Sequence, residues 1–82
     1  MEKDQQFLEF ILKNILDDFE NCKIERKVDE MGILFEILPP ENEIGKVLGK
    51  SGKNIKALRA ILGLYGVKND QKIFVKILNS EN

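Results

Sequence analysis

The 82-residue sequence contains no histidine, no tryptophan, one cysteine and one tyrosine. Without histidine, the chain lacks the commonest general base, the Ser-His and Cys-His nucleophile pairs and nearly every kind of zinc site. The single cysteine, Cys22, cannot form an internal disulfide, which agrees with a reducing compartment. These absences argue against histidine-based catalysis and against a zinc site.

Long apolar runs are also missing. No stretch of 18 residues is apolar, and the first residues are charged and polar, which argues against a membrane span and against a signal peptide. We therefore expect a cytoplasmic protein without membrane contact. Hydrophobic residues make up 43% of the chain and run through almost its whole length, which predicts one domain, 1–82, too small for a large cavity that binds a small-molecule substrate.

The net charge of −1 conceals an uneven distribution. Residues 1–43 hold 12 acidic and 5 basic side chains, whereas residues 44–60 hold five basic side chains and no acidic one. These five are Lys46, Lys50, Lys53, Lys56 and Arg59. A solvated helix face is the usual explanation for a single lysine, but five cations without an acidic partner indicate an anion-binding segment.

Two periodicities predict the secondary structure. Apolar residues at i, i+3, i+4 and i+7 predict a first helix over residues 5–20, with Asp4 as its N-cap. Alternating stretches predict three strands, of which the first two form a hairpin that ends at Pro39-Pro40. The predicted strands are residues 23–29, 33–38 and 72–78.

Between the second and third strands, residues 42–63 predict two helices joined by a glycine turn, the second ending around Gly63 to Gly66. The predicted order is helix, strand, strand, helix, helix, strand. This order is typical of an α+β domain in which the helices pack on one face of a three-stranded sheet.

The glycine turn has two interpretations. Gly49-Lys50-Ser51 matches the end of the phosphate-binding pattern G-x-x-x-x-G-K-[ST], but Gly45 lies one position too close, and two prolines separate the turn from the preceding strand. The other interpretation is a helix–GxxG–helix unit. Its two glycines allow a sharp turn and a close backbone approach, and the second helix directs its free N–H groups and positive dipole end at a phosphate. The sequence favours the second interpretation.

The stretch from Ile44 to Ile55 resembles the (I/V)-I-G-x-x-G-x-x-I core of KH domains, with Leu48 in place of the usual isoleucine. The element order resembles the type II, bacterial arrangement, and the length is similar to that of small stand-alone bacterial KH proteins. The resemblance implies a protein that is not an enzyme, that holds neither a metal nor a cofactor, and that clamps about four nucleotides of single-stranded RNA by their backbone. The expected RNA-binding residues are Gly49, Lys50, Ser51, Gly52, Lys46, Lys53, Lys56 and Arg59. The expected groove-lining residues are Ile44, Val47, Leu48 and Ile55.

The resemblance also implies a homodimer or a complex with a larger KH-containing partner, and roles in RNA chaperoning, cell elongation and envelope homeostasis. A protein-interaction module, in which RNA contact is minor, is the alternative. The acidic balance of residues 1–43 and the scarcity of aromatic side chains for base stacking support that alternative. We expect Phe7, Phe10 and Phe19 in the core, with a dimer surface as the alternative place for Phe10.

Overall fold

The computed structural model describes residues 1–79, so the last three positions of the predicted 1–82 domain lie outside the described residues. Its helices are α1 (Lys3–Lys13), α2 (Ile44–Leu48) and α3 (Lys53–Lys68), and its strands are β1 (Lys23–Asp29), β2 (Gly32–Leu38) and β3 (Ile73–Ile77). Short 3₁₀ turns lie at Phe19–Asn21, Glu41–Glu43 and Lys50–Gly52. The predicted α+β class and element order are confirmed.

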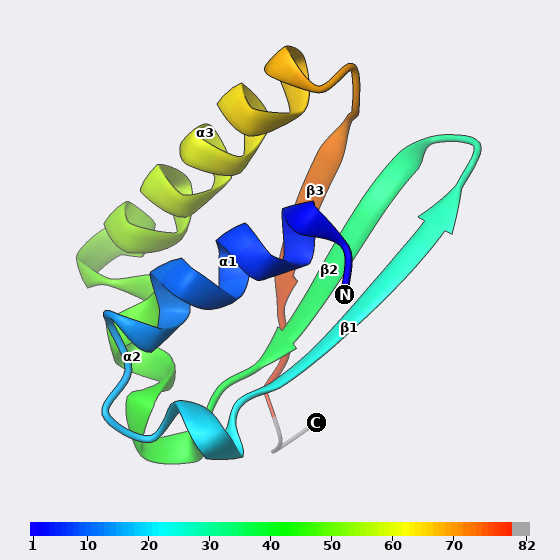
Figure 1. Ribbon diagram of the computed structural model, residues 1–82. Coiled ribbons are helices and arrows are strands. Elements are labelled where there is room, and N and C mark those ends of the chain that lie inside the picture. Colours follow the sequence, from blue (N-terminus) through cyan, green and yellow to red (C-terminus); the bar gives the residue numbers. More distant parts are fainter. Residues whose placement is uncertain (80–82) are drawn as a thin grey trace.

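The three strands form one mixed sheet in the order β1-β2-β3. β1 and β2 are an antiparallel hairpin, with Asp29 opposite Gly32, and β2 pairs in parallel with β3, with Phe35 opposite Val75. A parallel pair needs a crossover connection, and the stretch that carries α2 and α3 provides it. All three helices therefore lie on one side of the sheet (Figure 1).

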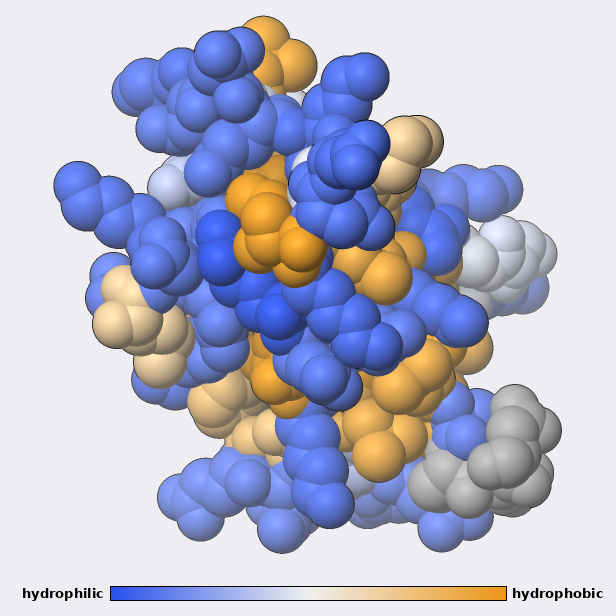
Figure 2. All heavy atoms as spheres, turned by 90° about the vertical axis from the view of Figure 1, so that its right-hand side faces the viewer, coloured by the Kyte–Doolittle hydropathy of each residue, from blue (hydrophilic) through white to orange (hydrophobic). Residues whose placement is uncertain are grey.

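The hydrophobic core lies between the helices and the sheet. Alternate residues of β2, Ile33, Phe35 and Ile37, are buried toward the helices, as the pleat of a strand dictates. The helical side of the core consists of Leu8, Leu12, Val47, Ile55, Leu58 and Leu62. Seen from the side of the β1–β2 hairpin, hydrophobic residues form separate patches between hydrophilic ones (Figure 2).

The prediction of a first helix over residues 5–20 is wrong at its end, because α1 stops at Lys13. The Asn14 side-chain amide donates to the Phe10 carbonyl at 2.7 Å, and the chain then turns. The backbone N–H groups of Asp17 and Asp18 donate to the carboxylate of Glu43, at 2.6 and 3.0 Å, instead of to a helical carbonyl. The apolar spacing continues past the helix because later residues such as Leu16 also pack in the core.

The start of α1 also differs from the prediction. Glu2 occupies the N-cap position, and Asp4 lies within the first turn, where it is buried. Its two carboxylate oxygens accept hydrogen bonds from Nε and Nη2 of Arg26 at 3.0 and 2.9 Å. Asp4 therefore fastens α1 to β1 and does not cap the helix.

The third helix is longer than predicted, since α3 continues through Gly63 and Gly66 to Lys68. At Gly66 a Cβ atom would collide with the carbonyl oxygen of Gln71. This glycine thus allows the following loop to approach the helix, and it does not end the helix. The strands depart less: β2 begins one residue earlier than predicted, and β3 is one residue shorter at each end.

Candidate nucleic-acid interface

The turn between α2 and α3 reverses the chain within four residues. Its backbone takes positive φ angles at Gly49 (75°), Ser51 (58°) and Gly52 (75°). The N–H of Gly49 donates to the Gly45 carbonyl at 2.8 Å, and the N–H of Gly52 donates to the Gly49 carbonyl at 3.1 Å. Lys50 and Ser51 are exposed at the tip of this turn, which we call the GxxG loop (residues 49–52).

The two glycines of the GxxG loop are required for different reasons. A Cβ atom on Gly49 would lie 2.5 Å from Cγ of Asn54, so both the space and the positive φ demand glycine. A Cβ atom on Gly52 would meet nothing closer than 3.8 Å, so only its positive φ favours glycine. Gly49 is therefore fixed by packing, and Gly52 by conformation alone.

Three cations beside the loop have no acidic partner. Lys50, Lys53 and Lys56 are exposed, and none of them forms an ion pair within residues 1–79. They lie on the loop and on the first turns of α3, where the helix dipole adds its own positive charge. The structure thus gathers uncompensated positive charge at one end of α3, which suits an anionic ligand.

Two of the sequence-predicted cations have partners within the chain. The ammonium of Lys46 lies 2.7 Å from Asp17 Oδ2 and 3.2 Å from Glu43 Oε1. These carboxylates raise the pKa of Lys46, chiefly through the hydrogen bond with Asp17. The guanidinium of Arg59 donates through Nε and Nη2 to the carbonyl of Val75, at 3.2 and 3.1 Å. Neither side chain is free in the way that Lys50 is.

The four predicted groove residues also separate into two pairs. Val47 and Ile55 are buried members of the hydrophobic core, so a ligand does not reach their side chains. Ile44 is half-buried and Leu48 is 37% exposed. Of the four, only Ile44 and Leu48 therefore leave apolar side-chain surface exposed.

A comparison with protein-family models agrees with this geometry. The model described as "KhpA/KhpB, KH domain" matches residues 5–77, which include both helices that flank the GxxG loop. The chain belongs to this family. The predicted resemblance to KH domains is confirmed, and the observed element order is the type II order that the sequence predicts.

Curated relatives cover nearly the same length as this KH domain. A Chlamydia pneumoniae protein named RNA-binding protein KhpA is 30% identical over 77 residues, which is 94% of this chain and 99% of the relative. Proteins of the same name from Clostridium perfringens and Borreliella burgdorferi are 28% and 26% identical, over 90% of this chain and 99% and 90% of their own lengths. No solved structure was found to match the chain.

Two residues that the sequence analysis did not single out support the loop of this KH domain. Glu43 is buried directly before α2, and its carboxylate accepts from Asp17, Asp18 and Lys46. These donors, above all the backbone N–H of Asp17, hold the pKa of Glu43 below its usual value. Asn54, in the first turn of α3, donates its side-chain amide to the Lys46 carbonyl at 2.7 Å. The nearness of each residue to the glycine motif was the only signal in the sequence.

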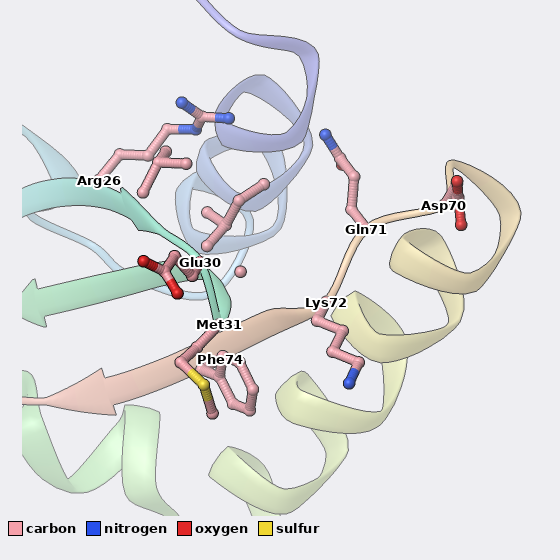
Figure 3. A pocket seen from close by; sticks show the side chains of 10 residues that line it. Arg26, Glu30, Met31, Asp70, Gln71, Lys72 and Phe74 are labelled. Carbon is pink, nitrogen blue, oxygen red and sulfur yellow. The ribbon is translucent and has the colours of Figure 1, made fainter.

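A separate hollow lies at the other end of α3, where the α3–β3 loop meets the tip of the hairpin. Figure 3 shows Arg26 on the α1 side of this hollow, and Met31 and Phe74 on the opposite side. The guanidinium of Arg26 is held by Asp4, as described above. Glu30, Asp70 and Lys72 add charges of both signs. The hollow therefore has no single charge that matches the anion-binding chemistry of the GxxG loop.

Within the part of the chain that the structure describes, no three acidic, cysteine or histidine side chains are grouped in a way that could hold a metal ion. None of the helices described there is long and apolar enough to cross a membrane.

Proposed function

We propose that this protein binds single-stranded RNA, without catalysis, by clamping the RNA backbone with Gly49-Lys50-Ser51-Gly52. The observation that carries the proposal is a set of three lysines that form no ion pair with any residue from 1 to 79 and that surround an exposed backbone turn, on a protein whose N-terminal half is acidic. The name shared by the curated relatives, RNA-binding protein KhpA, supports the same ligand.

In the proposed complex, the loop backbone lies against one or two phosphates. Lys50 adds a charge and Ser51 a hydroxyl donor, and Lys53 and Lys56 extend the contact along α3. Unpaired bases lie over Ile44 and Leu48, which give contact area without base specificity. Lys46 and Arg59 contribute directly only if RNA displaces their partners within the chain.

The affinity of one copy is expected to be low. Three lysines neutralise about three phosphates, and at about −0.7 per phosphate the slope of log K against log salt is about −2. Tyr65 is stacked on Phe7 at 5.3 Å between ring centroids, so one face of its ring is already covered. Two tethered copies gain affinity through effective concentration, which gives a dimer a functional purpose.

A second candidate function, protein interaction, has its own observation. Exposed apolar side chains follow α1 and the second half of α3: Phe10 is 65% exposed, Leu64 68% and Val67 80%. Phe7, Ile61, Leu64, Tyr65 and Val67 line an apolar hollow between the two helices. We propose that this helical surface, on the side of α3 away from the sheet, makes the homodimer or the contact with a KhpB-type partner.

The physiological proposal follows from the family and not from any residue described above. RNA chaperoning in the cytoplasm, with effects on cell elongation, cell shape and the biogenesis of the cell wall and envelope, is the role we propose for the RNA-binding activity. It is tested separately from RNA binding, by asking whether loop variants fail to restore cell shape in a strain that lacks the protein.

The binding test uses fluorescence anisotropy with a short unstructured RNA at two salt concentrations. We expect Lys50→Asp with Ser51→Asp to lower the affinity more than tenfold and to leave the fold unchanged, because both side chains are exposed. The control is Gln6→Glu with Lys23→Asp, which changes the net charge equally at exposed sites outside the loop segment.

Three outcomes are informative. A loss of binding confined to the loop variant supports the clamp, and equal losses in both variants indicate a general charge effect and contradict it. If the wild type does not bind at tens of micromolar, the interaction module becomes the better assignment. Light scattering on Leu64→Glu then tests whether the helical surface holds two copies together.

A further inference from the structure

Asn54 contacts both sides of the GxxG loop. It belongs to α3, which follows the loop, yet its side-chain Nδ2 donates to the carbonyl of Lys46 in α2 at 2.7 Å. The same side chain fills the space beside Gly49, where a Cβ atom would lie 2.5 Å from Asn54 Cγ and 2.8 Å from Asn54 Cβ. One side chain thus links the helix before the loop to the helix after it.

The hydrogen bond from Asn54 is accepted by α2, a helix that needs contacts outside itself to be stable. α2 has five residues, and so short a helix does not persist in water by itself. The last carbonyls of any helix also lack a partner within the helix. The Gly45 carbonyl receives the N–H of Gly49, and the Lys46 carbonyl receives the side chain of Asn54.

Lys46 is held at both of its ends. Its ammonium contacts Asp17 and Glu43, and its carbonyl accepts from Asn54. Because Glu43 also accepts the N–H groups of Asp17 and Asp18, α2 is fixed to the connection between α1 and β1. Asn54 then fixes α3 to this anchored helix, with the GxxG loop between the two.

We infer that Asn54 is a positioning residue for the GxxG loop: it sets the backbone conformation that RNA meets and does not itself contact a phosphate. The inference rests on the proposed function. A loop held in its binding conformation loses less freedom on binding, so the loss of Asn54 lowers the affinity without removing any charge. The slope against salt should therefore stay unchanged.

The test compares Asn54→Ala with Asn69→Ala. Asn69 provides a matched control, because its side-chain amide also donates to a helix carbonyl, that of Tyr65 at 2.9 Å, at the far end of α3. Amide NMR shifts and hydrogen exchange at Gly49, Ser51 and Gly52 report the loop conformation in the free protein. Anisotropy with a short unstructured RNA at two salt concentrations reports the affinity and its slope.

We expect Asn54→Ala to shift the loop amides, to speed their exchange and to weaken RNA binding about fivefold with an unchanged slope. Asn69→Ala should change neither the loop nor the affinity. If the alanine variant fails to fold, Asn54→Gln replaces it. The longer side chain keeps the amide donor but moves it away from the Lys46 carbonyl, so this variant should also shift the loop amides and weaken RNA binding.

The outcomes separate the two proposals. Unchanged loop amides in Asn54→Ala would overturn the inference, whatever happens to RNA binding. Shifted loop amides with unchanged RNA affinity would support the positioning of the loop by Asn54, and would instead overturn the proposal that RNA is bound there. Equal weakening in the Asn54 and Asn69 variants would also contradict the inference, because it would indicate a general effect on stability.

Discussion

Lys46 and Lys50 lie four residues apart in the same cationic segment, but the fold uses them differently. The ammonium of Lys46 contacts Asp17 and Glu43, whereas Lys50 has no ion pair within the described residues. We call Lys46 with its partners Asp17 and Glu43 the anchor. We call Lys50, together with Lys53 and Lys56, the free cations. The anchor holds α2 in place, and the free cations remain available to a ligand.

The difference shows that charge counted along the sequence overstates the charge offered to a ligand. Five basic residues occupy positions 44–60, but two of them, Lys46 and Arg59, are engaged by groups within the chain. Their partners come from the connection between α1 and β1, the turn before α2, and β3. A positive cluster therefore becomes a binding surface only where the fold leaves it without acids.

The largest expected effect is at Gly49, which lies between the helix that carries Lys46 and the free cations. Gly49→Ala adds a Cβ atom 2.5 Å from Asn54 Cγ at a positive φ, and should lower the free energy of unfolding by about 3 kcal/mol. Gly52→Ala has room for its Cβ, and should cost about 1 kcal/mol, from conformation alone. Urea unfolding measures both, and equal losses would contradict the packing role of Asn54.

Glu43→Gln should break the anchor and leave the free cations in place. The fold lowers the pKa of Glu43 below its ordinary value of 4.5, so its ionised form stabilises the protein above that pH. This contribution is lost as the pH falls through the lowered folded value. In wild type, the free energy of unfolding should therefore decrease as the pH is lowered below about 4.5. The variant should be less stable than wild type near pH 7, and its free energy of unfolding should depend less on pH in the acid range. If the free energies of unfolding of the two proteins, measured by urea unfolding at each pH, change in parallel with pH, this role of Glu43 is contradicted.

A smaller effect distinguishes the two lysines directly. Lys50→Gln should make the slope of log K against log salt less negative by about 0.7, because one phosphate contact is removed. Lys46→Gln should lower thermal stability and leave the slope as it is, since its charge is already compensated. Anisotropy titrations at four salt concentrations measure the slopes, and equal changes would show that Lys46 also contacts RNA.

The smallest expected effect concerns Cys22. Burial, and to a smaller extent the charges of Glu43 and Glu9, raise the pKa of its thiol to about 11. At pH 8 the thiolate fraction is then only about 0.1%, so iodoacetamide should react far more slowly than with an unfolded chain. Glu43→Gln should speed the reaction slightly. Fast alkylation of the folded wild type would contradict the environment described for the thiol.

The element order could be predicted from the sequence because each change of periodicity coincides with a chain-breaking residue. Pro39-Pro40 ends the apolar run of β2, and the Gly49 and Gly52 pair lies between the two helices. The early end of α1 could not be predicted in this way. It depends on Glu43, which lies 25 and 26 residues from the N–H groups it accepts.

The site was predictable to a similar degree. The glycine spacing located the turn, and the structure indeed places Lys50 and Ser51 at its exposed tip. The contacts of Lys46 with Asp17 and of Arg59 with Val75 were not predictable, because these partners are 29 and 16 residues away in sequence. Asn54 was missed for a related reason: its effect on the loop depends on the direction of its side chain.

The hydrogen bonds of Arg59 also affect the edge of the sheet at which another chain could add a strand. The N–H of Ile33 donates to the Lys72 carbonyl, and the N–H of Leu78 donates to the Ile37 carbonyl. The backbone N–H and C=O groups of the even-numbered residues of β3 therefore point toward β2, and those of the odd-numbered residues point away from it. Val75 thus directs its carbonyl to the open edge of the sheet. β3 has one charged residue among five, so this edge is open to strand addition by another chain. Arg59 covers its central carbonyl. An added strand would have to displace the guanidinium from this carbonyl, on an edge that lacks the charges present on β1.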